Sequence, residues 1–500
     1  MKRFRIVCLI SLFGLISICA NAQSEVTSTN MLYNAPYRHF INPAFEPLTE
    51  GYLYLPVLSH LSIYAGNNSL SLNNLVINKG GVSMWTLNPN SGVNIMDAFR
   101  QNTLIDANAN IALLGFGWRT KRGGYLHINL NERVDAGVTL PRDLFQFALG
   151  GGMTDLENGN FFNLKSLGVQ AQLYSEFSVG YSRKEAEIWT WGLKVKFLMG
   201  HAYAGMNNKN LNLYAQPEEW SLQGNGAIRL AAPLTAYPTD LNADNLFNGG
   251  FDWKGNLSIS APTLFNGFGG AFDLGFTVRP VKYVTLSAAL TDIGLIYWHR
   301  GREYSYAVDG TFSGMGTINY ADYKDAQGNF DSKQLGDTLS ARFKEVYTHA
   351  LTSTPGRAGF LAPLTMKLNV SAEVNLANDI VGLGVYSKTM LYNSRLYEEV
   401  TFGASVRPAS WFNFGVSYSF LNGKWSNVGV GLGLRGGPLV LTLAADYVPT
   451  TYAALNGKNV LPYKTQGINF EMGLGIVWGW KKKAAEAQKT TTPAKEEVVL

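Results

Sequence analysis

The sequence predicts an all-β fold, a transmembrane antiparallel up-and-down β-barrel of about fourteen strands. The prediction rests first on the stretch Gly467–Trp480, where large apolar residues occupy the even positions and small or polar residues most of the odd ones. Successive side chains of a strand point to opposite faces, so this stretch has one continuous apolar face. It is fourteen residues long, whereas soluble strands average about 5–6 residues and membrane-spanning strands need roughly 9–11.

The composition supports the same fold class. The chain is 46% hydrophobic but only 15% charged, against about 25% charged residues in typical soluble domains. Its mean hydropathy is −0.02, as expected when each strand has one apolar and one polar face, whereas a helical membrane protein is far more apolar. Beyond the N-terminus no run reaches the ~18 apolar residues that a membrane helix needs, so any insertion would be by strands.

Residues 1–22 are typical of a secretory signal peptide. Lys2, Arg3 and Arg5 form the basic start, Ile6–Cys19 the apolar core, and Ala20–Ala22 the small-residue cleavage site. Both cysteines lie in this segment, so the exported protein would have neither thiol nor disulfide. Removing three of the 41 basic residues leaves 38 against 36 acidic ones, a balance that indicates no nucleic-acid partner.

The sequence divides into four parts: the signal peptide 1–22, an N-terminal periplasmic segment 23–50, the barrel 51–480 and a disordered periplasmic tail 481–500. Pro suits the first turn of a helix, so a short helix is expected at Pro141–Gly150. Alternation predicts the strands Gly51–Ala65, Asn110–Arg119, Tyr125–Val138, Leu167–Tyr181, Ile188–Gly200, Gly269–Val278, Lys282–Asp292, Pro363–Leu376, Ile380–Tyr392, Tyr397–Val406, Trp411–Phe420, Ser426–Arg435, Leu439–Val448 and Gly467–Trp480.

The number of strands bears on the orientation of the chain. The regions 201–268 and 293–362 are less regular, and each has room for zero or two further strands, which gives fourteen, sixteen or eighteen. Short turns alternate with longer connections, which is the pattern of short periplasmic turns and long outer loops in outer-membrane barrels. An even number of strands then places both ends of the mature chain in the periplasm of a Gram-negative bacterium.

Three segments carry a resemblance to a known group of proteins: Asn42-Pro43-Ala44, the strand Gly51–Ala65 and the helix Pro141–Leu149. Here the chain resembles an uncharacterised family of outer-membrane barrels that is similar to FadL-type long-chain fatty-acid transporters. It is also similar to the PorV and PorP/SprF-like barrels of type IX secretion and gliding systems. In the transporter family the N-P-A segment belongs to an N-terminal hatch that plugs a fourteen-stranded lumen. The resemblance therefore implies that Asn42, Pro43 and Ala44 lie in a hatch.

Charged and polar residues lie opposite the apolar face of several predicted strands. A single charge inside a barrel is costly unless it is paired or meets water. Two interpretations stay open: a network of paired side chains, and a wet lumen in which these groups contact a passing solute. The lumen-facing candidates are His127, Arg133, Asp135, Glu176, Lys194, Lys196, Lys367, Glu373 and Glu471.

The sequence offers little for catalysis or for a cofactor. None of its six histidines has the spacing of a zinc site. The letters of a G-x-G-x-x-G motif occur at 431–436, but they lie inside strand alternation rather than between a strand and a helix, where a dinucleotide site needs them. A hydrolase at the outer rim, with His299 near Asp309 or His201 near Tyr203, is the weakest hypothesis, because solvated histidines are far commoner. We expect no cofactor and no enzyme.

These observations favour two functions. The first is a porin-like channel or transporter for small hydrophobic solutes across the outer membrane. The alternative is a non-catalytic barrel subunit or scaffold of a secretion, gliding or surface-assembly complex, suggested by the long outer loops and the tail 481–500. The expected partners are outer-membrane lipid, the barrel-assembly machinery and, for the second function, other subunits of such a complex.

Overall fold

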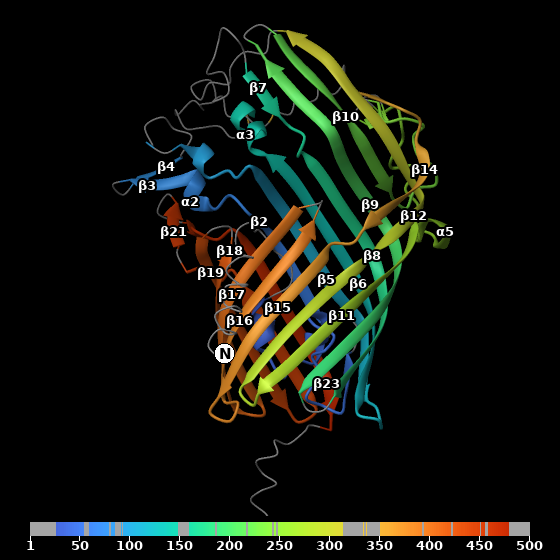
Figure 1. The fold of residues 1–500 in the computed structure, drawn as a ribbon. Helices are drawn as coiled ribbons and strands as arrows, with labels where there is room; N and C mark the ends of the chain where they lie inside the picture. Colours follow the sequence, from blue (N-terminus) through green and yellow to red (C-terminus); the bar gives the residue numbers. More distant parts are fainter. Residues whose placement is uncertain are drawn as a thin grey trace, which may run out of the picture.

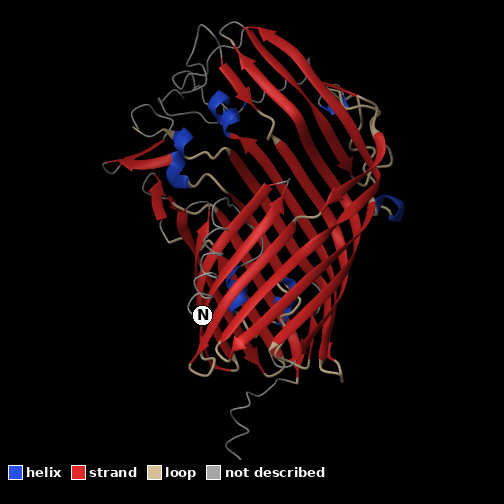
Figure 2. Cartoon of the chain, in the orientation of Figure 1, coloured by secondary structure: helices blue, strands red, loops and turns tan. Residues whose placement is uncertain are grey.

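The computed structural model describes residues 27–54, 60–79, 82–85, 92, 94–148, 160–185, 188–216, 219–242, 245–246, 249–313, 334, 337, 351–392, 395–421, 424–450, 452–455 and 459–479. These residues form a closed antiparallel barrel (Figures 1 and 2). The predicted signal peptide 1–22 and the tail 481–500 lie outside the described residues. So does Trp480, the last residue of the predicted final strand.

The barrel wall has fourteen antiparallel positions, as the sequence predicts, so the fold class is confirmed. Four positions are built from more than one strand: β1 and β2 share one, β8 and β7 (Asn160–Asn163) a second, β10 and β11 a third, and β15, β14 and β13 (Leu351–Ser353) a fourth. The wall strands are β1 (Gly51–Tyr54), β2 (Leu61–Asn67), β5 (Asn102–Arg119), β6 (Gly124–Pro141), β8 (Gly168–Glu185), β9 (Trp189–Ala215), β10 (Glu219–Ala231), β11 (Gly267–Val281), β12 (Val284–Ser313), β14 (Arg357–Pro363), β15 (Met366–Leu376), β16 (Val381–Tyr392), β17 (Arg395–Ala409), β18 (Phe412–Leu421), β19 (Lys424–Gly436), β20 (Leu439–Asp446) and β23 (Gly467–Trp478).

The barrel closes where the last strand meets the first. β23 pairs with β20 on one side and with both β1 and β2 on the other, with Leu53 opposite Ile476 and Ile63 opposite Phe470. Both halves of this first wall position then pair with β5. Around the barrel each of the fourteen described wall positions pairs with a neighbour on both sides, which a strand in a membrane requires because lipid offers no hydrogen-bond partner.

The outward face of the wall is apolar. On β11, Phe272, Leu274 and Phe276 are each more than 40% exposed, whereas Asp273 between them is fully buried. Aromatic side chains such as Trp478 and Trp411 are exposed near the end with the short turns, as in the aromatic girdles of outer-membrane barrels. An apolar outer face on a closed barrel is the surface that a lipid bilayer covers.

The wall is much taller on one side, and the sequence does not predict this extension. β9 has 27 residues and β12 has 30, against the roughly 9–11 that span a membrane. β9 pairs with β11 up to Gly200 and with β10 from Tyr203 onward, so β10 stands directly above β11 (Figure 1). The region 201–268, which reads as irregular in the sequence, therefore continues one strand and supplies another.

The extension has an apolar core of its own. Leu213 of β9 and Trp220 of β10 are buried against Phe162 of β7 (Asn160–Asn163). Phe147 of α3 (Arg142–Ala148) packs on the same cluster, so a helix is present where the sequence predicts one at Pro141–Gly150, of which residues 149 and 150 lie outside the described part. Smaller elements complete the outer end: α2 (Leu72–Leu75), β3 (Val76–Lys79), β4 (Val82–Trp85), η4 (Ile95–Asp97), α5 (Ala261–Leu264), β13 (Leu351–Ser353), β21 (Tyr452–Leu455) and β22 (Asn459–Pro462). No helix in the described part of the chain is long and apolar enough to cross a membrane.

Candidate functional site: the hatch and the charged lumen

The N-terminal segment lies inside the barrel. Its two short helices, η1 (Thr27–Met31) and η2 (Pro36–Phe40), are almost completely buried. Met31 fits against Gly403 and Gly415, where an added Cβ would approach its side chain to 2.4 and 3.0 Å. Wall glycines thus provide the space that the segment occupies, which gives part of the chain's high glycine content a physical reason. We call residues 27–45 the hatch.

Hydrogen bonds to inward-facing carboxylates hold the start of the hatch. The backbone N–H of Thr27 donates to Asp446 Oδ2 at 2.6 Å, and Ser28 donates to the same carboxylate through its backbone and its hydroxyl. Thr29 Oγ1 donates to Glu471 Oε1 at 2.9 Å. A carboxylate that accepts several N–H and O–H groups forms charge-assisted bonds, which are stronger than neutral ones.

The middle of the hatch is held by Glu373 and by an aromatic group. Tyr33 donates a hydrogen bond to Glu373, and the Arg38 guanidinium lies 3.8 Å from the same carboxylate. Tyr37 donates to Thr442 at 2.7 Å. Burial lowers the pKa of Arg38 to about 10. Arg38 belongs to the hatch, which does not itself span the membrane.

The Asn42-Pro43-Ala44 motif forms a tight turn against β11 and β9. Asn42 Oδ1 accepts the N–H of Ala44 at 2.8 Å, while its Nδ2 donates to backbone carbonyls of the wall at 3.4–3.5 Å. A Cβ on Gly275 would lie 2.1 Å from Asn42 Oδ1, and one on Gly192 would lie 2.3 Å from the Pro43 backbone. Glycine at these two wall positions is what allows the motif to approach so closely.

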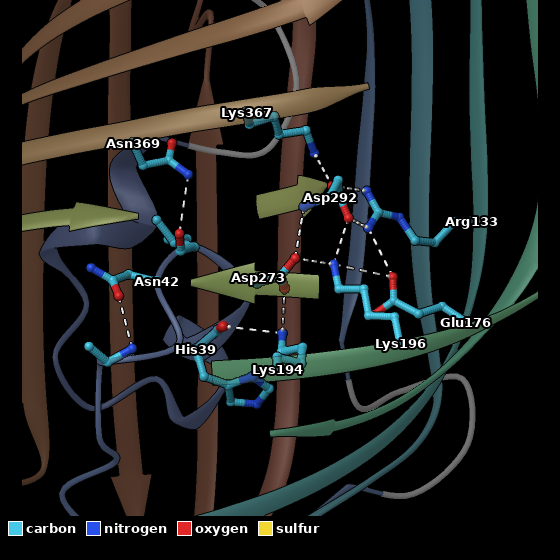
Figure 3. Close-up of polar contacts among 12 residues, drawn as sticks. His39, Asn42, Arg133, Glu176, Lys194, Lys196, Asp273, Asp292, Lys367 and Asn369 are labelled. Atoms are coloured by element: carbon cyan, nitrogen blue, oxygen red, sulfur yellow. Dashed lines mark hydrogen bonds and ion pairs between the residues drawn. The ribbon is translucent and has the colours of Figure 1, made fainter. Parts of the chain in front are cut away.

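Beside the hatch lies a cluster of seven buried charged residues (Figure 3). Lys196 Nζ is 2.8 Å from Asp273 and 2.6 Å from Asp292. Two guanidinium nitrogens of Arg133 donate to the two oxygens of Asp292 at 2.9 and 3.1 Å. The cluster comes from six neighbouring wall positions, and its members are Arg133, Glu176, Lys194, Lys196, Asp273, Asp292 and Lys367.

The cluster is joined to the hatch. Lys194 lies 3.6 Å from Asp273 and donates to the backbone carbonyl of His39 at 3.2 Å. The rings of His39 and His127 stack at 4.2 Å. Burial, together with the nearby His127 ring and the Lys194 ammonium, lowers the pKa of His39 well below its usual value. The cluster holds four cationic and three anionic groups, so nearly all of its charge is compensated internally.

The structure buries every lumen-facing candidate from the sequence. Five of them, Arg133, Glu176, Lys194, Lys196 and Lys367, belong to the charged cluster. Glu373 and Glu471 bind the hatch, His127 stacks on it, and Asp135 accepts a hydrogen bond from Tyr174. Whether any of these residues contacts a solute stays a prediction, as does the assignment of 23–50 as a separate unit.

Two members of the cluster escaped the sequence analysis. Asp273 had a usable signal, since it sits between the outward-facing Phe272 and Leu274 on a predicted strand. Asp292 had none, because Thr291 and Asp292 are consecutive and yet both buried. The pairing of β12 with β11 shifts register just before Ile293, and Asp292 has a φ of 61°. Such a bulge turns an extra side chain toward one face.

A second polar group lines the wall next to the cluster. His127, Asn129 and Asn131 of β6 each carry two buried polar atoms that lack a hydrogen-bond partner among the described residues. Gln172 and Ser178 of β8 have unpaired atoms in the same sense. Buried polar groups in proteins are nearly always bonded to protein or to ordered water, so this wall is suited to water or a polar solute.

The structure does not bring together the residue pairs of the rim-hydrolase hypothesis. His299 and Asp309 lie ten residues apart on β12, which is about 33 Å along a strand. The His201 ring bonds Ser175 and the Leu264 carbonyl rather than Tyr203. No group of three or more His, Asp or Glu residues in the described part of the chain could hold a metal ion. A pocket lies between the hatch and β12, β15 and β16, and its lining includes Asn42, Ser287 and Ser371.

The closed wall, the apolar outer face and the filled lumen define a hatch-bearing β-barrel of the outer-membrane type. The sequence matches the model of a family of unknown function, DUF5723, over residues 43–446. The chain therefore belongs to that family. No curated protein matches it.

Solved structures with the same type of fold are distant. The toluene transporter TodX of Pseudomonas putida is 11% identical, with 87% of this chain and 92% of that chain covered and a TM-score of 0.38. A FadL homologue of Pseudomonas aeruginosa is 11% identical over 93% and 100% of the two chains, with a TM-score of 0.36. The match to a family of unknown function agrees with the uncharacterised family that the sequence resembles. At this identity and TM-score, the two structures carry no argument about the function of this chain.

Proposed function

We propose that this protein is a hatch-gated channel for small solutes across the outer membrane. The observation that supports the proposal most is the way the hatch is held. It fills the lumen, yet several of its contacts are single hydrogen bonds between neutral groups, such as Tyr37 to Thr442 and Asn413 to the Met31 carbonyl. Each such bond contributes only about 1 kcal/mol net, because water replaces it when it breaks. A hatch held in this way can move without unfolding the wall.

The nature of the solute is a separate question. The sequence-based prediction is a small hydrophobic solute, and it stays a prediction. The groups that the hatch would uncover on moving include Glu373, Asp446 and Lys194, and these favour a solute that has at least one polar end. Transport of either kind needs no covalent chemistry from the protein.

A reversible lock tests the gating. A Cβ on Gly415 would lie 3.0 Å from Met31 Cβ, close to the 3.5–4.5 Å that a disulfide spans. The predicted mature chain has no cysteine, so Met31→Cys with Gly415→Cys would form a single defined bond. We expect solute flux into liposomes to fall to the protein-free level when this bond is oxidised and to recover on reduction.

The two single-cysteine variants are the matched controls, because each carries one substitution but cannot form the bond. Flux that is equal in the oxidised and reduced double variant, with disulfide formation verified by mass spectrometry, would refute gating by the hatch.

The scaffold function has one observation in its favour, the tall extension of β9, β10 and β12 above the apolar belt (Figure 1). A channel needs no such wall, whereas a partner at the cell surface could bind it. Lys209 of β9 is exposed and offers an amine for cross-linking in intact cells. Recovery of a defined partner that is lost in Lys209→Gln would support the scaffold; identical cross-link patterns would count against it.

A further inference from the structure

The outward face of the wall changes from apolar to polar at one level. Phe268 of β11, Tyr297 of β12 and Leu361 of β14 pair in one row across three neighbouring wall positions, and each is at least 45% exposed. In β10, which stands above β11, the exposed residues on the outward face are Gln223 and Asn225. The row therefore marks the outer edge of the apolar belt, the lipid-facing part of the wall.

The height of this row agrees with the outer surface of a bilayer. β11 has 15 residues from Gly267 to Val281 at its short turn, which is about 46 Å along the strand and about 35 Å along the membrane normal at a tilt near 40°. A bilayer has a hydrocarbon core of about 30 Å and is about 40–45 Å thick with its polar headgroup regions. With the short turns in the inner headgroup region, β11 begins where the acyl chains of the outer leaflet meet their headgroups.

The segment between β10 and β11 leaves the wall at this level. It joins Ala231, at the lower end of β10, to Gly267, at the upper end of β11, and α5 near its end lies outside the wall (Figures 1 and 2). Three apolar side chains of this segment, which we call the apolar ridge, are exposed: Ile259 by 78%, Leu257 by 56% and Leu264 by 37%. A single exposed apolar residue is normal in a protein, whereas a group of them marks a surface that a partner or a membrane covers.

Hydrogen bonds hold the apolar ridge in place. Leu257 pairs with Leu234 in a short antiparallel bridge. The backbone N–H of Ser260 donates to a side chain in the first turn of α5 at 3.0 Å. Side chains two residues apart in an extended segment point to the same side, so Leu257 and Ile259 face the same way, with the half-buried Ser258 between them. A flexible loop would fold such side chains away from water, but these bonds keep them exposed.

The apolar ridge is continuous with the apolar belt. The Leu264 carbonyl lies 3.0 Å from His201 Nδ1, and His201 is the extra residue of a bulge in the ladder between β8 and β9. The extra residue of a bulge is left out of the ladder and re-aims its side chain, which here ties the end of α5 to the wall. The next residue, Phe265, stacks on Phe268 of the belt row with ring centroids 6.4 Å apart. Whatever covers the belt at this level therefore also reaches the ridge.

We propose that the apolar ridge inserts into the outer leaflet and is covered by the acyl chains of its lipids. Its height and its continuity with the belt favour lipid over a protein, because a protein bound there has to displace the lipid around the belt. Interfacial segments bury their apolar side chains about 5–10 Å into the boundary between headgroups and acyl chains. Lys254, exposed three residues before Leu257, suits the same level, since a lysine stem follows apolar surface while its ammonium stays among polar groups. The ridge thus fixes the height of the wall on the side that carries the tall extension.

Depth-dependent quenching tests the insertion. The predicted mature chain has no cysteine, so Ile259→Cys gives a single site for an environment-sensitive fluorophore on the whole protein in phosphatidylethanolamine–phosphatidylglycerol liposomes. Leu361→Cys, in the belt row, is the lipid-exposed reference, and Gln223→Cys, on the polar outward face of β10, is the water-exposed control. We expect the emission of the Ile259→Cys probe to be blue-shifted from that of the control. A doxyl lipid that carries its nitroxide near the headgroup should quench this probe more than one that carries it near the chain end.

A second ridge variant, Leu257→Cys, makes the test independent of one position, and heat-modifiable electrophoresis verifies that each variant is a folded barrel. Its probe should be quenched to the same extent as that of Ile259→Cys. Emission and quenching of both ridge probes that equal those of Gln223→Cys would overturn the proposal and leave the ridge to water or to a protein partner. The ridge lies outside the lumen, so this result does not depend on gating by the hatch.

Discussion

Replacing Gly275 by valine should open the channel. The position lies on β11 inside the barrel, where an added Cβ would be 2.1 Å from Asn42 Oδ1 and 2.8 Å from the backbone nitrogen of Ala44. Contacts this short cannot be relieved by rotating a side chain, because the second partner is backbone. The Asn42-Pro43-Ala44 turn must therefore move away from the wall in Gly275→Val.

The size of the effect follows from the bonds that the turn makes there. Asn42 Nδ2 donates to the carbonyls of Phe276 and Ala288, and Asn369 donates to the carbonyl of Ile41 at 3.1 Å. Losing two or three such bonds, at about 1 kcal/mol each, weakens the seating of the hatch by roughly 2–3 kcal/mol. Since 1.4 kcal/mol is a factor of ten, the population with the hatch displaced should rise roughly 30- to 150-fold.

Single-channel conductance in planar bilayers measures that population as open probability. Gly270→Val is the matched control: it is on the same strand, but an added Cβ there has only one neighbour, at 3.7 Å. We expect frequent openings in Gly275→Val and none beyond wild type in Gly270→Val. The reasoning is refuted if a folded Gly275→Val barrel, verified by its heat-modifiable mobility, conducts no more than the wild type.

Three further predictions address the cluster, the hatch and the polar wall. Asp292→Asn removes a carboxylate partner of Arg133 and Lys196 and should lower the free energy of unfolding in urea by about 3–5 kcal/mol. Adding Lys367→Met should recover part of this loss. An unchanged free energy of unfolding would mean that water already compensates these charges. Burial lowers the pKa of His39, so below about pH 6.5 the protein binds more protons when the hatch is displaced than when it is seated. Lowering the pH from 8 to 5 should therefore raise the open probability. The rise should be smaller in His39→Gln. Asn129→Leu breaks no hydrogen bond to a described residue and should change the free energy of unfolding by less than about 1 kcal/mol. A loss above about 2 kcal/mol would show that water bound to Asn129 stabilises the fold.

The wall was predictable because a membrane imposes a strict pattern. Lipid demands an apolar side chain at every second residue, so stretches such as Pro363–Leu376 and Gly467–Trp480 are visible in the sequence, and the structure contains strands at Met366–Leu376 and Gly467–Trp478. The pattern ends where the membrane ends. In β9, Val195 and Phe197 are exposed to lipid, whereas beyond Gly200 the apolar side chains are buried in a separate core, so alternation no longer identifies the strand.

The site was predictable only in part, because pairing depends on neighbours that are remote in sequence. The alternation of side chains along the strand places Lys194 and Lys196 in the lumen. The same alternation could have placed Asp273 there, and Asp273 pairs with Lys194 in the ladder between β11 and β9. Alternation could not identify Asp292, since a bulge at this point changes which residues face the lumen. Nor could it show that Glu373 and Asp446 bind residues 340 and 419 positions away in the hatch.

A bulge explains how one strand can serve both the lipid-facing belt and the extension above it. In the belt, even-numbered residues of β8 and β9, such as Glu176 and Lys196, face the lumen. The odd-numbered residues between them face lipid. The extra residue His201 reverses this rule for the residues that follow, so the odd-numbered Tyr203 is buried, and it does so where β9 begins its extension. The same irregularity thus lets the wall change from a lipid-facing to a water-facing surface and brings an imidazole beside Ser175. Substitutions at Ser175 should therefore leave the lumen unchanged, and substitutions at Gly275 should leave the outer face unchanged, because one wall separates the two.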